Sequence, residues 1–134
     1  MATQSRIGIQ LEDGTVKSIY CHFDGYYDGV GQELMDSYTD REKVEKLIAL
    51  GDISFLCSEI EPTGPHSFND PQDGVTVAYH RDRGEDLIPQ YIDNSEESFF
   101  NSDRYTYLFN IDGVWMISER ITLEETLRTL LKIN

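Results

Sequence analysis

Alternating hydrophobic and polar positions predict a β-hairpin near the start of the chain. Residues 6–12 place apolar side chains at every second position, and Ile19, Cys21 and Phe23 do the same in the return strand over residues 16–23, which follows an Asp-Gly dipeptide. Period-two alternation is typical of a β-strand, and Asp-Gly favours a two-residue turn. Such a turn would set Ile7 opposite Tyr20, so that Tyr20 and His22 would share the face of Ile7.

A second hairpin is predicted over residues 105–110 and 114–118. Another Asp-Gly dipeptide joins these two strands, and a two-residue loop would set Phe109 opposite Met116. Between the hairpins, alternation over residues 75–79 predicts one further strand.

Apolar residues at intervals of three and four predict three helices, over residues 29–38, over residues 40–50 and from residue 122 onward. In the last two, a threonine precedes a glutamate by three residues, which is the pattern of a capping box. The expected N-caps are Asp28, Thr39 and Thr122.

The remaining segments have weaker patterns. Residues 61–74 contain three prolines and two glycines, which predict a long loop. Residues 53–60 fit either a short strand or an irregular apolar anchor. Residues 81–86 are expected to form a charged turn, and residues 87–103 an irregular acidic segment with room for one helical turn.

Together these elements predict the α+β class. We expect a single domain over residues 1–134, in which two hairpins and further strand segments build an antiparallel sheet. About three helices would cover that sheet, because its apolar faces need a second layer.

The charge of the chain narrows the choice of partner. Its 25 acidic and 11 basic residues give a net charge of −14, and residues 1–67 and 68–134 each carry −7. Direct nucleic-acid binding is not expected, since it needs clustered Lys and Arg, and anionic membranes are disfavoured likewise. The charge would either keep the protein soluble or complement a basic groove on another protein that otherwise holds nucleic acid.

The two cysteines, Cys21 and Cys57, show no pairing typical of a zinc site. The first residues lack the apolar segment of a signal peptide, and no apolar run has the length of a membrane span. We therefore expect a cytoplasmic protein with reduced thiols and no cofactor.

Three histidines and two aspartates form the candidate catalytic set. His22 precedes Asp24, and His80 precedes Asp82, by two residues, and such side chains point the same way in a strand. With His66 they would serve as general acids and bases, or His22 and His80 would hold a divalent metal. The alternative is that these residues only order loops through hydrogen bonds.

Aromatic side chains in the turn after residue 23 are candidate anchors for a protein partner. Exposed tyrosines are favoured in interfaces, and acidic residues lie close to them and in the acidic segment. The candidate partner-binding residues are Asp24, Tyr26, Tyr27, Asp28, Glu96 and Glu97.

Four segments resemble a family of small bacteriophage and prophage proteins: SIYCHFDGY (18–26), GDIS (51–54), HSF (66–68) and VTVAYHRDRGE (75–85). The resemblance covers about residues 18–85. It implies a phage accessory protein that handles a protein of the host cell, and hence the host cytoplasm as its location. Small acidic phage domains often inhibit host defence nucleases, some by mimicking the charge of DNA.

The leading hypothesis is a non-enzymatic binding protein that inhibits a host protein with a basic surface, such as a nucleic-acid-binding defence factor. A small metal-dependent hydrolase that uses the histidine and aspartate set is the first alternative. A structural or assembly protein that forms a homo-oligomer is the second.

Overall fold

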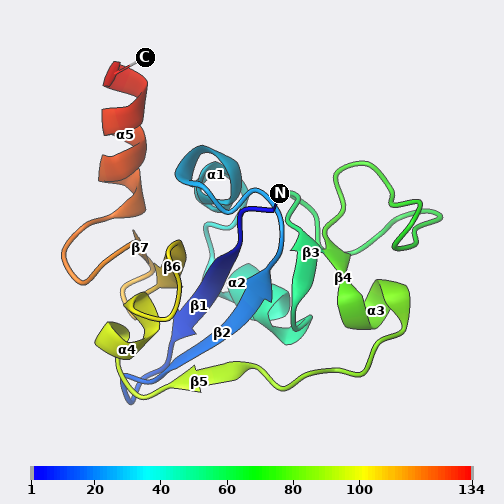
Figure 1. Ribbon diagram of the computed structural model, residues 1–134, viewed down its shortest axis with the longest axis horizontal. Helices are drawn as coiled ribbons and strands as arrows, with labels where there is room; N and C mark the ends of the chain where they lie inside the picture. The colour runs from blue at the N-terminus through cyan, green and yellow to red at the C-terminus, as the bar shows by residue number, and fades with distance from the viewer. Residues whose placement is uncertain (1, 134) are drawn as a thin grey trace.

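Seven strands of the described part of the chain form one mixed sheet at the centre of the molecule (Figure 1). The computed structural model describes residues 2–133, with side chains for residues 2–130. The strands are β1 (Ser5–Gln10), β2 (Val16–Cys21), β3 (Ile53–Phe55), β4 (Val77–Ala78), β5 (Tyr91–Asp93), β6 (Thr106–Phe109) and β7 (Trp115–Met116). Their order is β4-β3-β2-β1-β6-β7, and β5 pairs with the start of β2.

The α+β class is confirmed, and the sheet contains parallel as well as antiparallel pairs. β1 pairs with β6 in parallel, and β2 pairs with β3 in parallel. Parallel neighbours need a crossover connection. Between β2 and β3 the helices supply it, and β3 then begins beside the end of β2, where Ile53 pairs with Cys21.

Helices and helical turns lie on both faces of the sheet. They are a π-helical turn η1 (Tyr27–Gly31) and the α-helices α1 (Gln32–Ser37), α2 (Arg41–Ala49), α3 (Tyr79–Arg83), α4 (Glu96–Phe100) and α5 (Leu123–Ile133). The larger core lies between one sheet face and α1, α2 and α5, and α2 is visible behind β1 and β2 in Figure 1. Ile7, Ile19 and Tyr107 are fully buried in it.

A smaller core on the opposite face depends on a glycine. Phe99 of α4 packs with Val16 and Leu108, directly over Gly8 of β1. A Cβ atom at residue 8 would lie 2.9 Å from the Phe99 ring, so only glycine lets α4 approach the sheet this closely.

Both predicted hairpin registers are wrong by one residue, for the same reason. β1 pairs Ile7 with Ile19, not Tyr20, and β6 pairs Phe109 with Trp115, not Met116. Each loop has three residues and ends in a glycine with a positive φ, +89° at Gly14 and +77° at Gly113, which is a common hairpin connection of its own.

The shifted register exchanges the faces of β2. Ile19 and Cys21 now share the large core with Ile7, whereas Tyr20 lies on the opposite face, beside Arg6. The predicted grouping of Tyr20 and His22 with Ile7 is therefore wrong, because side chains alternate between the two faces of a strand.

The helix ends match the sequence prediction in part. Thr122 caps α5, since its Oγ1 accepts the Glu125 N–H at 3.1 Å. α2 is capped by Asp40 instead of Thr39, because the Asp40 carboxylate accepts the Lys43 N–H at 2.9 Å. Asp28 lies inside η1, which has no side-chain cap, so its predicted capping role is wrong.

The middle of the chain is less regular than the two hairpins. Residues 53–60 contain both a short strand and an irregular apolar anchor. The strand β3 comes first, and the buried side chains of Leu56 and Ile60 follow it. The expected strand over residues 75–79 shortens to β4, and the expected charged turn begins as α3. The strand ends there because the Asp82 carboxylate folds back to accept the Ala78 N–H at 2.8 Å.

Residues 61–74 form the predicted loop, and the following acidic segment holds more structure than expected. After α3 the chain runs as a long strap along β2, where it forms β5, and then turns into α4 (Figure 1). Ser95 caps α4 by accepting the Ser98 N–H at 3.2 Å.

Candidate functional site

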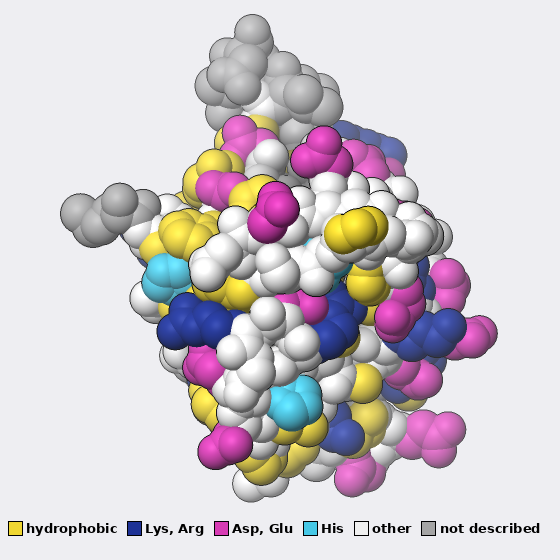
Figure 2. All heavy atoms as spheres, turned by 90° about the vertical axis from the view of Figure 1, so that its right-hand side faces the viewer, with side chains coloured by type: hydrophobic (Ala, Val, Ile, Leu, Met, Phe, Trp, Pro, Cys, Tyr) yellow, Lys and Arg dark blue, Asp and Glu magenta, His cyan; other side chains and the backbone are white. Residues whose placement is uncertain are grey.

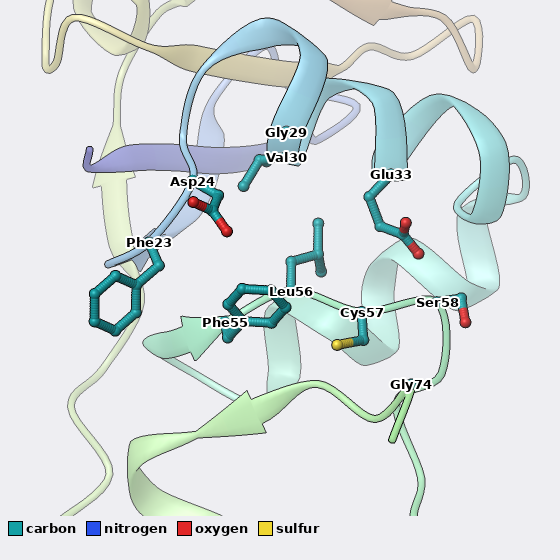
Figure 3. Close-up of a pocket in the computed structure, with 10 residues that line it drawn as sticks. All are labelled: Phe23, Asp24, Gly29, Val30, Glu33, Phe55, Leu56, Cys57, Ser58 and Gly74. Atoms are coloured by element: carbon teal, nitrogen blue, oxygen red, sulfur yellow. The ribbon is translucent and has the colours of Figure 1, made fainter. Parts of the chain in front are cut away.

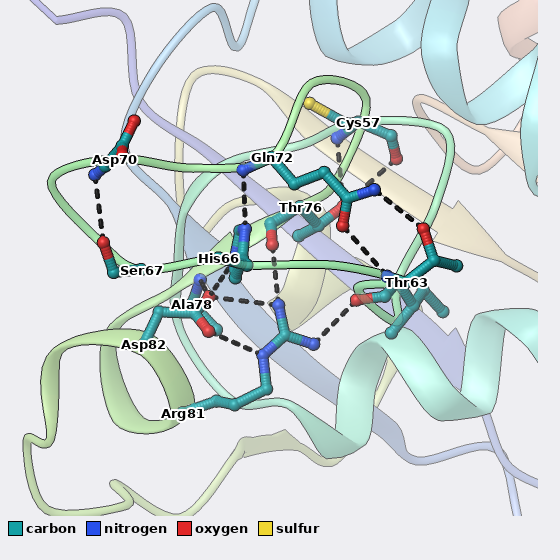
Figure 4. Close-up of polar contacts among 11 residues, drawn as sticks. Cys57, Thr63, His66, Ser67, Asp70, Gln72, Thr76, Ala78, Arg81 and Asp82 are labelled. Atoms are coloured by element: carbon teal, nitrogen blue, oxygen red, sulfur yellow. Dashed lines mark hydrogen bonds and ion pairs between the residues drawn. The ribbon is translucent and has the colours of Figure 1, made fainter.

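His66 and Asp82 form a buried pair beneath the 61–74 loop (Figure 4). The Gln72 backbone N–H donates to His66 Nδ1 at 2.9 Å, so the proton of the neutral ring is on Nε2. That nitrogen lies 3.1 Å from Asp82 Oδ2, and the two side chains are only 2% and 4% exposed.

Arg81 completes this pair into a network that fastens the loop to α3. Its guanidinium donates to Asp82 at 2.8 Å and to the carbonyl oxygens of Ile60 and Thr76, each at 2.7 Å. Burial raises the pKa of Asp82, but the bonds from Arg81, Ala78 N–H and His66 outweigh it and leave the pKa below its usual range. Asp82 is therefore a carboxylate at neutral pH.

This network is a structural cross-link. The lone pair that a general base needs is engaged at His66 Nδ1 by Gln72, and the remaining nitrogen faces Asp82. A substrate would have to displace the loop before it reached the imidazole. For His66 and Asp82, the geometry favours the alternative interpretation of the sequence, in which these residues order a loop through hydrogen bonds.

The other two histidines lie apart from this pair. His22 Nδ1 is 2.6 Å from the Tyr20 hydroxyl, and Asp24 accepts a bond from the Tyr26 hydroxyl at 2.9 Å. His80 lies on α3, and its Nδ1 is 2.6 Å from the Glu85 carbonyl oxygen.

The expected pairing of histidine with aspartate two residues later is therefore wrong at both places. Residues two apart do not face each other on a helix, so Asp82 meets His66 instead of His80. Within residues 2–130, whose side chains the structure describes, no three His, Cys, Asp or Glu side chains gather closely enough to hold a metal ion.

The candidate partner-binding residues occupy two separate places. Asp24, Tyr26, Tyr27 and Asp28 follow the end of β2, whereas Glu96 bonds to Gln10 at its start. The length of β2 between these two ends is about 17 Å. Glu97 neighbours Glu96 on α4 and is exposed.

The candidate residues that follow the end of β2 differ in their exposure. Tyr26 and Asp28 are exposed, but Tyr27 is half-buried, with its ring 5.1 Å from that of Tyr105. Tyr27 covers the core with part of its surface.

A groove with exposed aromatic walls lies beside the same turn (Figure 3). Phe23 and Phe55 are 42% and 40% exposed and form its apolar side. Asp24 and Glu33 point toward the cavity from the other side. The cavity has a volume of about 310 Å³. We call this hollow and its continuation the phenylalanine groove.

The continuation is a second hollow of about 480 Å³. It shares Phe23 and Phe55 with the first and adds Phe68 from the 61–74 loop. Asp73 adds a further carboxylate at its border. The groove is thus apolar at its base and acidic at its edge.

The thiol at the base of the groove is a weak nucleophile at neutral pH. Burial, together with the nearby Glu33 and Asp73 carboxylates, raises the pKa of Cys57 to about 11. Only the thiolate attacks electrophiles, so at neutral pH this side chain acts as part of the apolar wall.

Sequence reasoning missed Phe55 and misplaced Phe23. The pairing register of β3 with β4 shifts between Ile53 and Phe55, and irregularities of this kind re-aim side chains. Phe23 was placed in the predicted strand over residues 16–23, but β2 ends at Cys21. The Asp-Gly pair at residues 24 and 25, which marks a turn, was the available signal that Phe23 lies beyond the strand.

Neither a family model, a curated protein nor a solved structure matches this chain. Among the helices that the structure describes, none has the length and apolar character needed to cross a membrane. The class of protein that the site supports therefore rests on the geometry above.

Proposed function

We propose that this chain is a non-enzymatic binding protein that docks on a basic surface of another protein. The carrying observation is the phenylalanine groove, in which exposed Phe23 and Phe55 are bordered by Asp24, Glu33 and Asp73. Exposed aromatic side chains next to hydrogen-bonding groups supply most of the energy in many interfaces. A partner segment with apolar and basic residues complements this surface.

The overall charge supports the same partner. Figure 2 shows acidic side chains scattered over the face of the 61–74 loop and α3, with hydrophobic side chains exposed between them. A net charge of −14 would accelerate association with a basic protein and make it sensitive to salt. If that basic surface is one that binds nucleic acid, docking inhibits it by competition.

The phage resemblance supplies the setting of this proposal. The partner would be a protein of the bacterial host, such as a nucleic-acid-binding defence factor, and the complex would form in the host cytoplasm. The hydrolase alternative draws no support from the three histidines, because each bonds to a different neighbour.

The test is a capture experiment with matched variants. Tagged wild-type chain is incubated with bacterial lysate at low and moderate salt, and the retained proteins are compared with those retained by Phe55→Ser. Ile111→Ser is the control, since Ile111 is also an exposed apolar residue but lies in the loop between β6 and β7. We expect one basic protein that Ile111→Ser retains and Phe55→Ser loses.

Binding of that protein should weaken about tenfold or more in Phe55→Ser, as expected for an aromatic anchor. Its salt dependence should flatten when Asp24, Glu33 and Asp73 are replaced by Asn or Gln. Added duplex DNA should displace the chain if the docked surface binds nucleic acid. Equal capture by all three proteins, or a salt slope unchanged by the charge variants, would contradict the proposal.

A further inference from the structure

A second, smaller cavity lies on the far side of β3, apart from the phenylalanine groove. It has a volume of about 180 Å³ and opens between the end of β2, the start of α3 and the first part of the strap. Its walls include Tyr20, Asp52, Tyr79, His80, Leu87 and Ile88. This volume is below that of pockets for drug-sized ligands and suits one side chain or a small amine.

Polar side chains in the wall of this cavity offer hydrogen-bond acceptors. Asp52 Oδ1 accepts the Tyr20 backbone N–H at 3.0 Å, which fixes the carboxylate in the wall. Among the described residues no donor bonds to its second oxygen. The Tyr20 hydroxyl is 2.6 Å from His22 Nδ1, so the phenol oxygen is also held in place.

His80 adds an acceptor of a less obvious kind. Its Nδ1 lies 2.6 Å from the Glu85 carbonyl oxygen. A carbonyl oxygen only accepts, so His80 Nδ1 carries the proton and donates it. In the neutral ring the lone pair is then on Nε2, and no described residue donates to that nitrogen.

The charge at this cavity is negative and largely uncompensated. Asp52, Glu85 and Asp86 line it, and none of the Lys and Arg side chains within residues 2–130 does. Arg83 bonds to Glu85 at 2.8 Å and offsets that one carboxylate. Asp52 and Asp86 form no ion pair within the described part of the chain.

Apolar and aromatic side chains complete the cavity. Leu87 and Ile88 are 48% and 53% exposed. Leu87 lies against the backbone of Gly51, where a Cβ atom would be 2.9 Å from its Cδ1. Tyr20 and Tyr79 supply aromatic rings, whose faces attract cations. The complementary ligand is a cation with several N–H donors at the end of an apolar stem.

We propose that this cavity binds a lysine side chain of the protein partner. The tetrahedral ammonium has three donors, which match the Asp52 carboxylate, His80 Nε2 and the Tyr20 hydroxyl, and its alkyl stem packs along Leu87 and Ile88. This proposal rests on the proposed function, because it names one residue type that the basic partner presents.

The test is an NMR titration of the ¹⁵N-labelled full chain with Nα-acetyl-lysine methylamide. We expect concentration-dependent shifts of the backbone amides of Tyr20, Asp52, His80 and Leu87. The matching norleucine compound has the same stem without the ammonium and should leave them unshifted. The arginine compound should bind more weakly, because its planar guanidinium does not fit three acceptors in one small cavity.

Two variants give the charge its own control. Asp52→Asn keeps an oxygen that accepts the Tyr20 N–H but removes the negative charge, and it should raise the Kd for the lysine compound about tenfold. Asp112→Asn removes the same charge from the exposed loop between β6 and β7 and should leave the Kd unchanged. The fold of both variants is checked from the unshifted amides of the sheet.

The outcomes separate this proposal from the proposed function. The lysine site is wrong if the lysine compound shifts none of these amides, or if Asp52→Asn and Asp112→Asn weaken binding equally. In either case, capture that is lost only in Phe55→Ser still supports the proposed binding protein. If free cadaverine binds a hundredfold more tightly than the lysine compound, the cavity is a site for small amines and the lysine assignment is overturned.

Discussion

His66 and His80 lie in two regions built from the same kinds of residue, yet only one region is available to a ligand. The backbone partner of Nδ1 makes the difference. At His66 it is an N–H group, which places the ring proton on Nε2 against Asp82. At His80 it is a carbonyl oxygen, which leaves Nε2 with a free lone pair.

The surroundings extend that difference. Asp82 accepts from Arg81 and from Ala78 N–H in addition to its contact with His66, so its bonding capacity is used within the chain. Asp52 accepts one backbone N–H and borders a cavity. The comparison teaches that unsatisfied acceptors at a cavity indicate a binding site, whereas a close His–Asp contact by itself does not.

Neutralising Asp82 and Asp52 in turn tests the difference between the two regions most strongly. Asp82→Asn should lower the free energy of unfolding by about 3 kcal/mol, because it removes one member of a buried charge pair. Asp52→Asn should lower it by less than about 1 kcal/mol, since the amide oxygen still accepts the Tyr20 N–H. Urea unfolding monitored by circular dichroism measures both, and equal losses would erase the distinction between the two regions.

The histidines provide a second, smaller contrast. His66→Ala should lower the free energy of unfolding by about 2 kcal/mol, because it leaves the Gln72 N–H without its acceptor and removes a buried side chain that contacts Asp82. His80→Ala should cost less than about 0.5 kcal/mol, as expected for an exposed side chain. A larger loss at His80 than at His66 in the same urea experiment would reverse the roles given to them.

The pH dependence of the free energy of unfolding tests the charge state of Asp82. Its folded pKa lies below the ordinary value of 3.8, so the folded state favours the carboxylate. The resulting stabilisation is complete above that ordinary value and is lost as the pH falls through the folded pKa. The stability difference between wild type and Asp82→Asn should therefore stay constant between pH of about 7 and 5 and shrink below about pH 4. A difference that grows toward acid pH would contradict this sign.

The cysteines test the smallest effect, which is the access of reagents to one thiol in the larger core, Cys21, and one in the wall of the phenylalanine groove, Cys57. Burial raises the pKa of Cys21 to about 12, and that of Cys57 to about 11. In the folded chain a disulfide reagent should modify Cys57 slowly, at a rate that increases with pH, and leave Cys21 unmodified. Both should react in urea. Fast reaction of both thiols in the folded chain at neutral pH would show that the core around Cys21 opens readily.

The sequence predicted most elements but not their offsets. Alternation located the first hairpin, and the Asp-Gly dipeptides located the turns of both hairpins. Each glycine is the third residue of its loop, however, so both registers are shifted by one. Loop length depends on how the strands pack, and the dipeptide is compatible with two-residue and three-residue loops.

The candidate site was less accessible from the sequence. Asp24 borders the phenylalanine groove, and His80 borders the smaller cavity, as members of the predicted sets. Phe55, Asp52 and Leu87 were missed, because they come from segments without a clear period. Their positions follow from long-range contacts, such as the approach of Leu87 to Gly51, which no local pattern encodes.

The parallel pairing of β1 with β6 has a consequence for how the protein comes into being on the ribosome. Ile7 pairs with Tyr107, 100 residues later in the chain, so the central strand of the sheet is synthesised long before its neighbour exists. Until then β1 and β2 form a hairpin with one edge unpaired, and isolated hairpins are only marginally stable in water. Folding is therefore completed late and slowly, as expected for a topology rich in long-range contacts. During synthesis the nascent chain exposes an apolar strand edge that chaperones would recognise.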